Sequence, residues 1–83
     1  MPQHDQETYK QEVVSKYKNI VKRAAELAKK DKTATLTDEE NAERGMLLGQ
    51  RTNMENELKK LFVGDELAVA QKIRDLYMEA LDN

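Results

Sequence analysis

The N-terminal third of the chain carries an apolar stripe with the spacing of an α-helix. Its members recur at steps of three and four residues: Tyr9, Val13, Val14, Tyr17, Ile20, Val21, Ala24, Leu27 and Ala28. Side chains spaced in this way lie on one side of a helix, and no strand-like alternation competes with the pattern. We therefore predict an amphipathic helix from about Gln6 to Asp31, roughly 39 Å long at ~1.5 Å per residue. The polar residues 1–5 are expected to form a disordered tail.

A helix start signal follows a short break in this pattern. Thr37 and Glu40 match a capping box, in which the threonine hydroxyl accepts from the backbone three residues on and the glutamate reaches back. Leu36, just before the cap, can pack onto the first turns. We predict a second helix from Asp38 to about Phe62. Its apolar stripe consists of Leu47, Met54, Leu58, Leu61 and Phe62.

A third helix should begin almost at once. Gly64 fits the left-handed residue that often follows a helix end, and Asp65 fits the N-cap of the next helix. This helix is expected to run from Glu66 to about Leu81. Its core positions are Val69, Ile73, Leu76 and Ala80, with Tyr77 beside them.

These elements predict an all-α, three-helix up-down-up bundle formed by a single domain over residues 1–83. A chain of this length has a marginal core, and without cysteines it has no disulfide to support it. The third helix, about 24 Å long, is too short to cover a hairpin of two long helices. We expect the uncovered part near the 33–37 loop or the N-terminal half of the second helix, where self-association would complete the bundle.

Two pairs of opposite charges lie four residues apart on the second helix. Glu40 with Arg44, and Arg51 with Glu55, can meet on the surface of an isolated helix. Each such pair would add only ~0.2–0.5 kcal/mol.

The sequence offers little for catalysis or metal binding. His4 is the one histidine and lies in the polar N-terminal segment, and cysteine is absent. No metal-ligand, nucleotide-loop or catalytic-triad spacing is present. We therefore expect no enzyme, no metal and no cofactor. No signal peptide or bilayer-spanning apolar run is readable, so the expected location is cytoplasmic, away from membranes.

Cations gather between Lys16 and Lys32, where Glu26 and Asp31 are the acidic residues. They could bind the phosphates of a nucleic acid or nucleotide, or an acidic partner. The candidate anion-binding residues are Lys16, Lys22, Arg23, Lys29 and Lys30. A solvated helix face is the favoured interpretation, because the whole chain has a net charge of −2 whereas nucleic-acid domains are usually basic.

Two glycines lie one turn apart within the second helix. At ~100° per residue, Gly45 and Gly49 point about 160–200° away from Leu47, opposite the apolar stripe. A face of small residues allows another backbone to approach closely. The candidate partner-binding residues are Ala42, Gly45, Gly49, Thr52 and Asn56, flanked by Met46 and Leu48. The alternatives are that the glycines are tolerated on a solvent-facing side, or that the helix bends or breaks there.

These features favour a small, non-catalytic interaction or regulatory module that docks on a partner protein and self-associates to a homo-oligomer. By analogy alone, such chains resemble inhibitors, immunity proteins and accessory proteins in size and charge. The alternative is nucleic-acid or nucleotide-phosphate binding through the basic face of the first helix. An enzyme assembled across subunits around Arg44 and Arg51 has no positive support.

Overall fold

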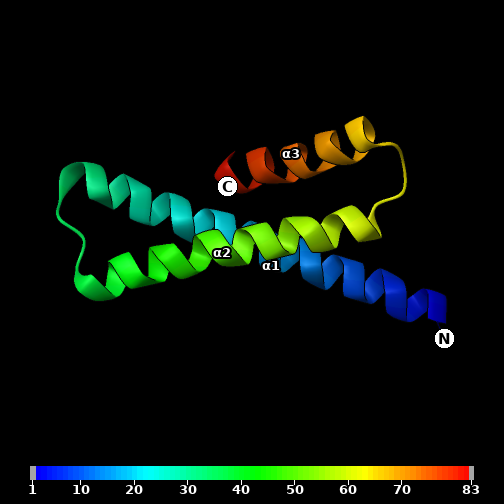
Figure 1. The fold of residues 1–83 in the computed structure, drawn as a ribbon, viewed down its shortest axis with the longest axis horizontal. Helices are drawn as coiled ribbons and strands as arrows, with labels where there is room; N and C mark the ends of the chain where they lie inside the picture. Colours follow the sequence, from blue (N-terminus) through cyan, green and yellow to red (C-terminus); the bar gives the residue numbers. More distant parts are fainter. Residues whose placement is uncertain (1, 83) are drawn as a thin grey trace.

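The chain folds into three α-helices that run up, down and up (Figure 1). The computed structural model describes the backbone of residues 2–82 and the side chains of residues 7–82. The helices are α1 (Pro2–Thr33), α2 (Asp38–Leu61) and α3 (Glu66–Asp82). The predicted all-α, three-helix class is confirmed, and the predicted boundaries of α2 and α3 each lie within one residue of the observed ones.

The first helix begins at Pro2, ahead of the predicted start at Gln6. Proline is favoured in the first turn, because its missing N–H is not needed there. A helix boundary does not measure order, so the predicted disorder of residues 1–5 stays a prediction. Met1 and the side chain of His4 lie outside what the structure describes.

The capping box at the start of α2 is confirmed. The Glu40 N–H donates to Thr37 Oγ1 at 3.1 Å, and the Thr37 N–H donates to Glu40 Oε1 at 2.9 Å. Leu36, immediately before the cap, is buried with Leu27 and Leu47. The polar cap and this apolar contact together fix the α1–α2 turn.

The two residues predicted to form the α2–α3 turn, Gly64 and Asp65, have the predicted roles. Gly64 has a φ of 141°, and a Cβ at this position would lie 3.3 Å from Ala68 Cβ. Asp65 caps α3, because its Oδ1 accepts from the Ala68 N–H at 2.8 Å. Glycine is therefore required by both the backbone angle and the close approach of α3.

The core has two separate parts. The larger part joins all three helices around the fully buried Tyr17 and Leu58. The smaller part joins only α1, the loop and α2, with Leu27, Leu36 and Leu47 at its centre. The hairpin therefore has three layers at one end and two at the other.

The third helix accounts for this difference. It packs mainly on α1, where Lys18 Nζ meets Glu79 Oε2 at 2.9 Å, and much less on α2. Figure 1 shows that α3 ends near the middle of the hairpin, so the half next to the α1–α2 loop is uncovered, as the sequence predicted. The result is elongated, with a radius of gyration of 14.6 Å, against about 12 Å for a compact chain of this length.

Candidate functional site

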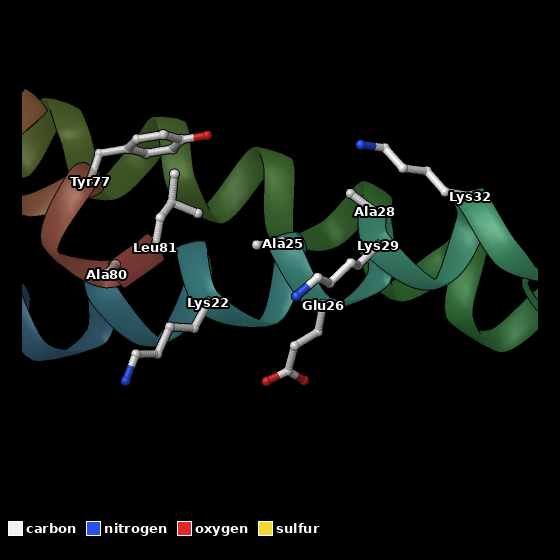
Figure 2. Close-up of a pocket in the computed structure, with 9 residues that line it drawn as sticks. All are labelled: Lys22, Ala25, Glu26, Ala28, Lys29, Lys32, Tyr77, Ala80 and Leu81. Carbon is white, nitrogen blue, oxygen red and sulfur yellow. The ribbon is translucent and has the colours of Figure 1, made fainter. Parts of the chain in front are cut away.

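A groove opens where α3 ends and the trough between α1 and α2 continues. Its closed end is formed by the last turns of α3, at Tyr77, Ala80 and Leu81. Figure 2 shows Ala25 and Ala28 of α1 lying between these residues and Lys32. The part beside α1 has a volume of about 520 Å³. A second part, of about 200 Å³, shares Ala25, Ala28 and Tyr77 with it and reaches α2 at Leu48.

Short side chains on α1 line the floor of the groove. Ala24, Ala25 and Ala28 occupy the turns of α1 that follow the end of α3. Leu48 forms part of the opposite wall and is 47% exposed. The floor and one wall are therefore apolar and face solvent, a combination that commonly marks an interaction surface.

Cations surround this apolar floor. The positively charged residues that line it are Lys22, Lys29, Lys32, Arg44 and Arg51. The three lysines form no ion pair with any residue that the structure describes. Glu26 also lines the groove, but it is engaged with Arg23 at 3.2 Å. The lining is therefore strongly positive, although the chain as a whole is slightly acidic.

Arg51 has an unusual environment at the closed end. Its guanidinium Cζ lies 5.8 Å from the centroid of the Tyr77 ring. Its Nε is buried and donates to no described acceptor. Buried donors are normally satisfied, so this part of the groove lacks an acceptor.

The predicted anion-binding residues are not gathered into one site. Lys22 and Lys29 line the groove, whereas Arg23 and Lys30 turn toward α2. Arg23 Nε donates to Glu43 at 2.8 Å, and Lys30 Nζ donates to Glu40 at 2.6 Å. Lys16 lies elsewhere, beside residues of α2 that are outside the groove.

These contacts lower the pKa values of two carboxylates on α2. The hydrogen bond from Lys30 Nζ, followed by the one from the Thr37 N–H, lowers the pKa of Glu40 to about 2. The hydrogen bond from Arg23 lowers the pKa of Glu43 and raises that of Arg23 itself. The cations at these two positions are thus already neutralised within the hairpin.

The two ion pairs that the spacing allows within α2 do not form among the described residues. Glu40 meets Lys30, and Arg44 Nη1 lies 3.3 Å from Asp31 Oδ2, so α1 supplies both partners. Glu55 accepts from the Tyr17 hydroxyl instead of meeting Arg51. The spacing shows only what an isolated helix allows, whereas the hairpin offers opposite charges across the α1–α2 seam.

The predicted partner-binding face of α2 is exposed. Ala42, Gly45, Gly49, Thr52 and Asn56 all lie on the surface, with Met46 at 64% exposure. A Cβ at Gly45 or Gly49 would meet no atom within 4 Å outside its own turn. The helix continues through both glycines, so the alternative of a break there is wrong. Leu48 is the one member of the set that lines the groove.

Sequence reasoning alone did not find the groove. It assigned Ala24 and Ala28 to the core stripe and gave Ala25 no role. The sequence signal was the group of alanines at positions 24, 25 and 28 of α1, but which of them line a groove depends on where α3 ends.

Across the described residues, no three histidine, cysteine or acidic side chains are close enough to hold a metal ion. None of the described helices combines the length and apolarity needed to cross a membrane. Comparison of the chain with protein-family models, with curated proteins and with solved structures finds no match. A function must therefore be inferred from the geometry.

Proposed function

We propose that this chain is a non-catalytic helical interaction module, regulatory or accessory in kind, that docks on a partner protein. The observation that carries the proposal is the half-covered hairpin. Because α3 ends near the middle, the open half offers a groove with an apolar floor and a positively charged rim. The cytoplasm is its expected location from the sequence alone.

The docking surface can be tested by site-specific photo-crosslinking in the cells that make the protein. A photoreactive amino acid replaces Ala28 in the groove or, as the matched control, Ala70 on the exposed part of α3. We expect one protein to be captured from position 28 and not from position 70. Capture of the same proteins from both positions, or of none from either, contradicts docking in the groove.

We propose self-association as a second activity, through the outer face of α2. Its support is the open space above Gly45 and Gly49, beside the exposed Met46. A second helix could approach this backbone closely, since no side chain in the described part of the chain covers it.

Sedimentation velocity over a wide concentration range tests this activity. Gly49→Leu should weaken any association by filling the face, whereas Gln50→Leu adds the same side chain on another face of α2 and should not. A sedimentation coefficient that stays monomeric at every concentration removes self-association from the proposal. Equal weakening by both leucines shows that the glycine face is not the contact.

Nucleic-acid or nucleotide-phosphate binding remains the second candidate. This function is favoured by Lys22 and Lys29, which form no ion pair with any described residue. It is weakened by the pairing of Arg23 and Lys30 with α2. Phosphate contacts release counterions, so affinity for a short duplex should fall steeply between about 50 and about 500 mM salt. No measurable binding at the lower salt excludes it.

A further inference from the structure

We propose that the groove receives an acidic amphipathic helix of about three turns, supplied by a partner protein and laid between α1 and α2 beyond the end of α3. The inference rests on the proposed function and names the kind of partner that the same surface fits. It follows from the shape of the groove, its charge, and two polar groups at its closed end.

The shape of the groove suits a helix. From Lys22 to Lys32, α1 rises about 15 Å, which is about three helical turns. The smaller part of the groove has α1 on one side and α2 on the other, and α3 itself packs on α1, with less contact to α2, over the other half of the hairpin (Figure 1). The alanines at positions 25 and 28 leave room for a second helix axis to approach α1. Leu48 and Leu81 then offer apolar contacts at the sides.

The charge of the groove favours an acidic occupant. Lys22, Lys29 and Lys32 stand at its edges without an ionic partner among the described residues, and Arg44 has a single 3.3 Å contact to Asp31. An amphipathic helix with apolar residues on one face and carboxylates on its flanks would place opposite charges at these edges. A second copy seated groove to groove would bring the same cations face to face, since a two-fold interface pairs a patch with itself.

Two groups at the closed end lack a hydrogen-bond partner. Arg51 Nε is buried without an acceptor, and the Tyr77 hydroxyl bonds to no described residue. Figure 2 shows the hydroxyl directed along the groove, away from α3. A carboxylate or backbone carbonyl at the end of an incoming helix could accept from the Tyr77 hydroxyl, and from Arg51 Nε once the Arg51 side chain turns into the groove. The floor, by contrast, offers alanines rather than the exposed aromatic rings on which the bases of a single-stranded nucleic acid stack.

The probe is a synthetic peptide of about 12 residues, with leucines on one helical face and glutamates on both flanks. A second peptide has lysine at every glutamate position. Binding to the full chain is followed by the amide NMR signals of the ¹⁵N-labelled protein. We expect saturable shifts at Ala25, Ala28, Leu48 and Tyr77, and affinity about tenfold higher for the acidic peptide than for the basic one.

Exposed lysines provide variants that leave the core intact. Lys29→Glu with Lys32→Glu should remove the preference for the acidic peptide. Lys59→Glu with Lys60→Glu is the matched control, because it reverses two exposed charges at the end of α2, outside the groove, and should leave the preference unchanged. Ala28→Trp should abolish binding by filling the floor, and circular dichroism establishes that each variant is folded.

Equal affinity for the two peptides overturns the acidic helix, as do shifts confined to the outer face of α2. Tighter binding of a short DNA duplex that survives Ala28→Trp overturns it in favour of a nucleic acid. If the peptides fail but crosslinking from position 28 still captures one protein, this inference falls and the interaction module stands. If crosslinking and self-association also fail, the proposed function falls with it.

Discussion

The hydroxyl of Tyr17, whose side chain is 0% exposed, donates a 2.8 Å hydrogen bond to Glu55 Oε2 across the α1–α2 seam. The same pair of residue types recurs toward the N-terminus of α1, where the Tyr9 hydroxyl donates to Glu57 Oε1 at 2.9 Å. Tyr9 was predicted to lie on the core stripe, but it is 46% exposed. The fold thus contains the same interaction in a buried and an exposed setting.

Removing the two hydroxyls should therefore have unequal effects. Tyr17→Phe should lower the free energy of unfolding by about 1–2 kcal/mol, because the half-buried Glu55 loses a donor that water replaces poorly. Tyr9→Phe should cost much less, since water can reach Glu57 more freely. Urea denaturation of both variants measures the difference. Equal losses would show that burial does not strengthen the Tyr17 bond.

Alkaline pH should destabilise the fold through the same residue. Burial, followed by the hydrogen bond to Glu55, raises the pKa of Tyr17 above its ordinary value of 10.0. A raised pKa in the folded state means that the unfolded chain loses its proton first. The stabilisation is therefore complete below pH 10 and declines as pH rises further. Stability measured upward from about pH 9 should fall less steeply in Tyr17→Phe than in the original chain; parallel curves would exclude Tyr17 as the cause.

Acid should reduce the stability of the end of the hairpin next to the α1–α2 loop. The bonds from Lys30 and the Thr37 N–H lower the pKa of Glu40 from 4.5 to about 2. The unfolded chain therefore binds this proton first, so the stabilisation is present above pH 4.5 and is lost as pH falls toward 2. Thermal unfolding across this range should show a smaller acid loss in Glu40→Gln. Glu39→Gln is the control, because Glu39 lies one residue away and forms no ion pair within the described part of the chain; this variant should keep the full loss.

The sequence predicted those parts of the fold that depend on neighbouring residues. Apolar spacing gave the helices, and the Thr37–Glu40 box and Asp65 gave the starts of α2 and α3. The ion pairs of Glu40 and Arg44 could not be predicted from the sequence, because they depend on which α1 residues face α2. That relation is set by packing between helices rather than by spacing within one.

The candidate site also divides into features that the sequence predicts and features that depend on how the helices pack. Helix lengths alone predicted that part of the hairpin would stay uncovered. They could not identify the groove residues, because Ala25 lines it only where α3 has ended, and α3 ends there because it packs on α1 rather than α2. The outer face of α2 was predicted from angles within one helix, and its exposure is confirmed while its partner stays a prediction.

Replacing glycine by alanine should raise the free energy of unfolding at two positions and lower it at a third. Gly45→Ala and Gly49→Ala should each raise the free energy of unfolding by about 1 kcal/mol, since the helix gains propensity and the new Cβ meets nothing within 4 Å. Gly64→Ala should lower it by more than about 1 kcal/mol, because φ is 141° and Ala68 is close. Chemical denaturation of the three variants tests this. A loss at Gly45 or Gly49 would mean that the outer face of α2 is already covered, as in an oligomer.

The two-layered end of the hairpin should open without unfolding the rest. Leu27, Leu36 and Leu47 are its buried centre, whereas the other end is held by a larger cluster from three helices. Regions with fewer buried apolar contacts open at lower free energy, so amides next to the α1–α2 loop should exchange hydrogen faster than those around Tyr17 and Leu58. Leu36→Ala should accelerate exchange at the loop end alone, while Leu58→Ala should accelerate it throughout. Hydrogen exchange followed by mass spectrometry resolves the two patterns, and uniform acceleration by Leu36→Ala would show that the hairpin unfolds as one unit.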